Sequence, residues 1–175
     1  MTDGAAILVV MWLAVLAYQD CRHRRLPNVL TVGGALFALV WRFGSGGVPE
    51  LMSGVWGGIV CGLFLLLPFI LHAAGGGDIK MLFAVGCAMG LRQVPTVILF
   101  TSFAGLLVMV VLLVWGHADP RRLKHCFRTV FDWRYDRKAG AAALPPKTNE
   151  KCCIPFGVAI ALGTWVTILF DISMR

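Results

Sequence analysis

Long runs of apolar residues, separated by short polar connections, are the main feature of this sequence. These runs predict helical spans over residues 4–19, 29–43, 51–71, 79–91, 94–116 and 154–172. A helix needs about 20 apolar residues to cross a bilayer, within a range of about 17 to 25. The first, second and fourth runs are shorter, and they require snorkelling ends or local thinning of the bilayer. The pattern predicts an all-α polytopic membrane protein that forms a six-transmembrane-helix bundle.

Composition and charge placement favour the same class. Hydrophobic residues make up 58% of the 175 residues and charged residues 14%, whereas soluble domains carry about 25% charged residues. Every charged residue lies in a connection or near the end of an apolar run. The net charge of +7 therefore indicates connections beside a membrane, and we expect no nucleic acid partner.

The distribution of Lys and Arg predicts the orientation. Of the 16 basic residues, 13 fall in one set of alternate connections, and the other set holds only Arg42, Arg92 and Arg175. Cytoplasmic connections are enriched in Lys and Arg. We therefore expect the first set to face the cytoplasm and both termini to lie outside. Residues 1–175 are interpreted as one membrane-embedded domain in a prokaryotic inner membrane, with a cytoplasmic loop at about 117–153.

This loop contains a predicted surface helix. In "PRRLKHCFRTVFDW", Leu123, Phe127, Val130 and Phe131 recur at helical spacing among basic residues. Such an amphipathic helix binds acidic lipid headgroups, so a bilayer with acidic headgroups is an expected partner. The following "KAGAAALPPKTNEK" is typical of a flexible tether.

The cysteines do not indicate a metal site or a disulfide framework. No two of them have C-x-x-C spacing, so neither a zinc ribbon nor a set of structural disulfides is expected. We expect no metal and no cofactor. The six cysteines are Cys21, Cys61, Cys87, Cys126, Cys152 and Cys153.

Two acids are predicted to lie at the same membrane surface. Asp20 ends the first span on the cytoplasmic side, and Asp78 opens the fourth span directly after three glycines. Two carboxyl groups that lie close together tend to share one proton. The charged member can then activate a water while the protonated member polarises a peptide carbonyl, as in aspartic proteases. Glycines beside Asp78 would let a substrate backbone approach closely.

Structural interpretations of the same residues remain open. Asp20 can pair with the neighbouring arginines of "CRHRR", and Asp78 can cap the fourth helix. Asn28, which follows Pro27, can cap the second span.

Three motifs resemble those of a known family. The stretch "GGGDIKML" is similar to the G-x-G-D signature of membrane aspartyl proteases in its prepilin peptidase version. "DCRHRRLPN" resembles the other aspartate motif of that family, and "IPFGVAIALG" resembles its C-terminal motif. The motifs occur in family order and span nearly the whole chain, so the chain resembles the type IV prepilin peptidases.

The resemblance implies an aspartic endopeptidase, a hydrolase that removes the leader from prepilin-like precursors at the cytoplasmic membrane face. It implies that Asp20 and Asp78 are the catalytic pair. It also implies residues that bind substrate, shape the glycine loop or pack near the site. These residues are Gly75, Gly76, Gly77, Lys80, Pro155 and Gly157.

The resemblance also limits the expected activity. Bifunctional members carry paired C-x-x-C motifs and a methyltransferase region in a longer first loop, for which the segment from Cys21 to Asn28 is too short. The chain is most similar to short peptidases of Flp/Tad pilus systems or to preflagellin peptidases, and a presenilin-like protease is a further alternative. Two alternatives from other functional classes remain open, a non-catalytic scaffold and a small transporter. Transporters, however, usually place ionisable groups near the bilayer midplane.

Overall fold

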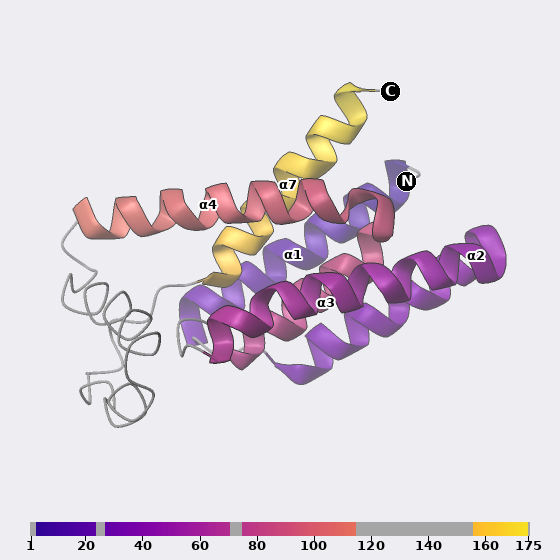
Figure 1. Ribbon diagram of the computed structural model, residues 1–175, viewed down its shortest axis with the longest axis horizontal. Helices are drawn as coiled ribbons and strands as arrows, with labels where there is room; N and C mark the ends of the chain where they lie inside the picture. Colours follow the sequence, from indigo (N-terminus) through magenta and orange to yellow (C-terminus); the bar gives the residue numbers. More distant parts are fainter. Residues whose placement is uncertain (1–2, 24–26, 71–74, 115–155, 175) are drawn as a thin grey trace, which may run out of the picture.

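The structure, a computed structural model, describes residues 3–23, 27–70, 75–114 and 156–174, and every regular element in these ranges is helical. The elements are α1 (Asp3–His23), α2 (Asn28–Ile70), α3 (Gly76–Met89), the 3-10 turn η1 (Leu91–Gln93), α4 (Val94–Val114) and α7 (Phe156–Ser173). Figure 1 shows them packed as a bundle. The predicted all-α class is confirmed for these ranges. The predicted surface helix of the long loop lies outside them, as does Pro155.

Four segments are long and apolar enough to cross a membrane, which fits a multi-pass membrane protein. They are Gly4–Arg22, Asn28–Ile70, Leu91–Val111 and Phe156–Ser173. Helix α3, with 14 residues, is shorter than the usual crossing length of about 17 to 25 residues. Many outward-facing side chains of the bundle are apolar, including Met11, Phe103 and Leu107, as contact with lipid requires.

Helix α2 is a helical hairpin. Its 43 residues would extend about 64 Å if straight, about twice the thickness of the hydrocarbon core. At Gly47 the backbone leaves the helical region, with φ 66° and ψ −153°, and the chain turns back on itself (Figure 1). The predicted spans 29–43 and 51–71 are therefore the two arms of this hairpin.

Arg42 holds the turn of the hairpin against the end of α3. Its guanidinium pairs with the carboxylate of Glu50 on the second arm. It also donates a hydrogen bond to the backbone oxygen of Ala88, at 3.0 Å. The hydrogen-bond acceptors of this arginine, which ends an apolar run, thus lie within the protein.

Successive helical segments run in alternate directions (Figure 1). The end of α1 and the starts of α2, α3 and α7 consequently lie at one end of the bundle. The start of α1 and the end of α7 lie at the other end. This alternation is what brings the predicted site residues, far apart in sequence, to the same end.

The second arm of α2 and helix α3 approach each other through glycines. A Cβ at Gly57 would lie 2.5 Å from the backbone oxygen of Gly86, and a Cβ at Gly86 would lie 2.7 Å from the carbonyl carbon of Gly57. Small residues are typical where membrane helices pack closely. The core around this contact consists of fully buried apolar side chains, among them Leu13, Leu16, Leu65, Met81, Leu82 and Val85.

We expect Gly86→Ala to destabilise the bundle by about 1–3 kcal/mol, because its methyl group must push α2 and α3 apart. The matched control is Gly62→Ala on the second arm of α2, in the same contact between α2 and α3, where a Cβ meets Phe83 at an ordinary 3.5 Å. Unfolding in mixed detergent micelles measures both variants. Equal stability of Gly86→Ala and the parent protein would contradict this account of the packing.

Two helix starts differ from the sequence prediction. Helix α3 begins at Gly76, so Gly76 and Gly77 lie in its first turn rather than in an irregular loop. Among the described glycines, positive φ angles occur at Gly47 and Gly90, so the glycines before Asp78 need no left-handed backbone. The predicted cap at Asn28 is wrong, because the carbonyl of Pro27 accepts hydrogen bonds from the backbone N–H groups of Leu30 and Thr31.

Candidate active site

Asp20 lies in the last turn of α1, and its side chain is buried, with 8% of the residue exposed. Its Oδ2 accepts a hydrogen bond of 2.9 Å from the backbone N–H of Gly157, the second residue of α7. Backbone N–H groups in the first turn of a helix have no partner within the helix, and the helix dipole there favours negative charge. The start of α7 therefore provides a binding site for a carboxylate.

Gly157 permits this contact because it has no side chain. A Cβ at this position would lie 2.6 Å from Oδ2 and 2.9 Å from Cγ of Asp20. Both distances are too short for any side chain unless Asp20 or α7 moves. The structure thus brings Gly157 and Asp20 into direct contact.

Asp78 is the third residue of α3 and caps its start. The backbone N–H of Gly75 donates to Asp78 Oδ2 at 3.1 Å, and the backbone N–H of Asp78 donates to the carbonyl of Gly75 at the same distance. This is the acidic half of a capping box. The capping interpretation of Asp78 is therefore right, and it involves one of the two carboxylate oxygens.

The electrostatic environment links the two acids. The pKa of Asp78 is raised from 3.8 to about 6; burial contributes most to this rise, the hydrogen bond from Gly75 opposes it, and the charge of Asp20 adds to it. Asp78 precedes the predicted fourth span, at the end of the bundle where α1 ends. The two carboxyl groups therefore lie close enough to interact, although α2 separates them in the sequence.

We expect Asp20→Asn to lower the pKa of Asp78, because it removes a neighbouring negative charge that favours the protonated form. The infrared band of the protonated carboxyl group, followed against pH in the purified protein, measures this pKa. Asp171→Asn, at the far end of α7, is the control and should leave the titration unchanged. An identical Asp78 titration in Asp20→Asn would show that the two groups do not interact.

Lys80 connects α3 to the start of α2. Its Nζ donates a hydrogen bond of 2.9 Å to the side-chain oxygen of Asn28. Sequence reasoning placed Lys80 near the site but did not assign Asn28 this contact. The sequence feature that could have indicated a role for Asn28 is the Pro–Asn pair that ends the first aspartate motif, "DCRHRRLPN".

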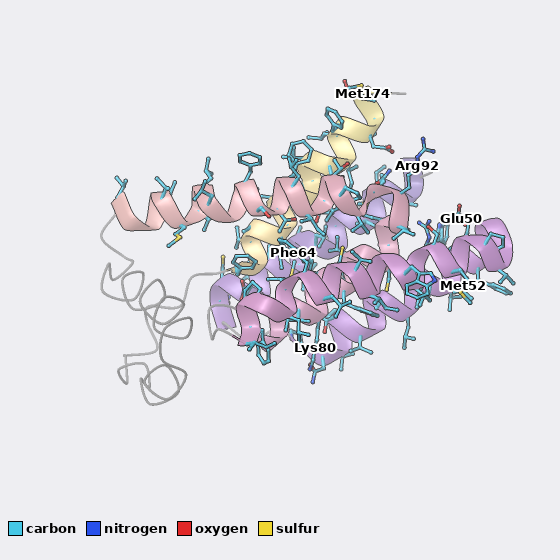
Figure 2. The ribbon with its side chains drawn as sticks, viewed as in Figure 1. Glu50, Met52, Phe64, Lys80, Arg92 and Met174 are labelled. Carbon is cyan, nitrogen blue, oxygen red and sulfur yellow. The ribbon has the colours of Figure 1, made fainter. Side chains whose placement is uncertain are left out.

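Asp171, an acid of the same type as Asp20 and Asp78, lies far from this end of the bundle. Asp171 stands 14 residues after Gly157 on α7, which corresponds to about 21 Å along a helix axis. Figure 2 likewise shows Glu50 and Arg92 at the end of the bundle opposite to the start of α3. Within the described ranges, no three metal-ligating side chains gather. His125, Cys126, Cys152 and Cys153 lie outside those ranges.

Comparison with known proteins places these residues in a family context. The profile of the type IV leader peptidase family, Peptidase_A24, matches residues 7–110, which include Asp20 and Asp78. The prepilin leader peptidase/N-methyltransferase of Aeromonas hydrophila is 31% identical over 179 residues, covering 97% of this chain and 50% of the relative. The protein of the same name from Neisseria gonorrhoeae is 29% identical over 121 residues, covering 65% and 41%.

An archaeal protein is also similar. The preflagellin peptidase of Methanococcus voltae is 24% identical over 141 residues, covering 66% of this chain and 60% of the relative. The chain spans about half the length of the curated relatives it matches. No solved structure matches it significantly.

Proposed function

Because the chain belongs to the type IV leader peptidase family, we propose that it is a membrane aspartic endopeptidase that removes the leader peptide from prepilin-like precursors. The catalytic pair is Asp20 and Asp78. The observation that carries this proposal is the electrostatic interaction of two carboxyl groups from separate helices at one end of the bundle, Asp20 buried and Asp78 half-buried. A scaffold or a transporter does not require such a pair.

The two acids have different surroundings. Asp20 accepts a hydrogen bond from the first turn of α7, which fixes the orientation of its carboxyl group. Asp78 has its pKa raised to about 6, first by burial, which favours the neutral acid. We therefore assign the base to Asp20 and the shared proton to Asp78.

In the proposed reaction, Asp20 takes a proton from a water molecule as the water oxygen attacks the scissile carbonyl carbon. Asp78 gives its proton to the carbonyl oxygen, which forms a neutral tetrahedral diol. Collapse of the diol breaks the C–N bond, while Asp20 passes its proton to the leaving amine and Asp78 regains one from the diol. This is the division of roles in a two-carboxyl protease.

The topology belongs to the same proposal. We place crossings at α1, at both arms of α2, at the segment 79–91, at α4 and at α7, which makes six. The excess of Lys and Arg near the end that holds Asp20 and Asp78 favours a cytoplasmic position for the site. Cleavage would then occur at the cytoplasmic face of a prokaryotic inner membrane.

Two classes of precursor are candidates. Prepilin-like precursors are favoured by the similarity to a prepilin leader peptidase/N-methyltransferase over 97% of this chain, and among them we propose those of Flp/Tad systems. Preflagellins are the second candidate because of the similarity to a preflagellin peptidase. The proposal does not include methyl transfer. Bifunctional members carry their methyltransferase region in a longer first loop, whereas only four residues separate α1 from α2 here.

Co-expression of the full chain with candidate precursors tests the proposal. We expect a shorter product on a gel, with an N-terminus that begins at the junction between the leader and the hydrophobic segment. N-terminal sequencing of the product identifies the cleavage point. Precursors of both classes that stay intact beside a folded, membrane-inserted chain would contradict the proposed function.

A further inference from the structure

An open-sided groove lies between the first arm of α2 and helix α3. Its volume is about 180 Å³. The groove is lined by Thr31, Val32, Ala35, Ile79, Lys80 and Phe83. Successive residues of a helix point about 100° apart, so Ile79 and Phe83 face a different side of α3 from Asp78. The groove is therefore separate from the proposed cleavage site.

The groove continues an apolar surface of the bundle. Its lining is almost entirely apolar, and the neighbouring side chains of Val29 and Leu36 are 83% and 59% exposed. In a membrane protein, such a surface faces the hydrocarbon of the bilayer. The groove is thus open to lipid along its length.

A positive charge lies at the rim of this groove. Lys80, the one charged residue of its lining, borders the groove through its aliphatic stem, and Figure 2 shows this residue well separated from Arg92. The ammonium group has three N–H donors, of which one is used by the side-chain oxygen of Asn28. The others can bind an anion at the level where the helices meet the headgroups.

The size of the groove distinguishes possible occupants. A volume of 180 Å³ corresponds to only about one or two residues of a helix 10–12 Å across. The groove therefore cannot enclose a precursor helix, whereas part of a single hydrocarbon chain fits in it.

We propose that this groove is a binding site for one anionic phospholipid. An acyl chain lies against Ala35 and Phe83, and the phosphate binds the ammonium of Lys80 beside Asn28. Basic residues between membrane helices bind anionic headgroups in this way. The site is distinct from the predicted surface helix of the long loop, and it does not depend on the proposed peptidase activity.

Native mass spectrometry of the full chain, with phosphatidylglycerol or phosphatidylcholine added to the detergent, tests the proposal. We expect the parent protein to retain one phosphatidylglycerol in preference to phosphatidylcholine. Lys80→Gln should weaken this retention by about fivefold, the effect of one basic residue at a membrane surface. Val32→Phe, which adds volume at an exposed position of the lining, should strongly reduce the retention of both lipids.

Two variants serve as matched controls. Arg92→Gln removes one positive charge at the opposite end of the bundle, and Leu106→Phe adds volume to an exposed position on α4. Both should retain phosphatidylglycerol as the parent does. Inorganic phosphate at millimolar concentration should not displace the lipid, since it has no acyl chain to bind in the groove.

Three outcomes would overturn the proposal. The first is equal retention of phosphatidylglycerol by Lys80→Gln and Arg92→Gln. The second is loss of phosphatidylglycerol caused by phosphate alone, which would indicate an anion site without a lipid groove. The third is cross-linking of a precursor, undiminished by phosphatidylglycerol, through a photoreactive residue at Val32, which would make the groove a substrate site.

Discussion

Asp20→Asn and Asp78→Asn are each expected to abolish leader removal while the chain remains folded. General acid–base catalysis by one side chain contributes about 10²- to 10⁴-fold to a rate, so either loss should leave cleavage near the background. Asparagine has nearly the same shape as aspartate and keeps one oxygen that accepts hydrogen bonds. The contacts with Gly157 and Gly75 can therefore persist in the variants. Conversion of a co-expressed precursor, followed over time, measures the effect.

This pair of substitutions separates two roles of Asp78. Capping of α3 needs only an acceptor oxygen, which asparagine supplies, whereas catalysis needs a group that can carry and release a proton. Asp171→Asn is the matched control, because it makes the same change at the far end of α7 and should process precursor normally. Near-normal cleavage by either Asp20→Asn or Asp78→Asn would show that the proposed pair is not catalytic.

Gly157→Ala is expected to lower kcat by about 100-fold, the cost of moving a catalytic group by about 1 Å. The added methyl group would lie 2.6 Å from Asp20 Oδ2, so the carboxylate must rotate or α7 must shift. Either movement disturbs the hydrogen bond that holds Asp20 in position. KM should change little, since Gly157 contacts the catalytic acid rather than the substrate.

Gly105→Ala is the control for this substitution. Position 105 lies on α4 against the same end of α7, and a Cβ there first meets the ring of Phe156 at 3.3 Å. That ring can move by a few tenths of an ångström without affecting Asp20. Comparable losses in both variants would indicate general damage to the α4–α7 packing, and an unchanged kcat in Gly157→Ala would remove Gly157 from the site.

The positions of the helices were largely predictable from the sequence, but their exact starts were not. Apolar runs predicted each helix within a few residues, because a bilayer demands long apolar segments. The start of α3 was predicted too late, since glycines usually signal a break. Here Gly76 and Gly77 lie in the first helical turn, where Asp78 supplies the cap.

Asn28 illustrates a second reason why the sequence alone did not predict the structure. Its position after Pro27 predicted a helix cap from local preference, whereas in the structure its side chain accepts a hydrogen bond from Lys80 on α3. Local propensity cannot anticipate a partner from another helix. The same is true of Arg42, whose acceptors come from the second arm of α2 and from the end of α3.

By itself, the sequence determined that this chain is a bundle of apolar helices of the leader peptidase family, with acids at the ends of two of them. Hydropathy and motif spacing carry that information because they depend on residues near one another in the chain. Only the tertiary structure decided that Asp20 is buried against Gly157 and interacts with Asp78. Those contacts depend on how α1, α3 and α7 pack, and packing is a property of the whole bundle rather than of any one segment.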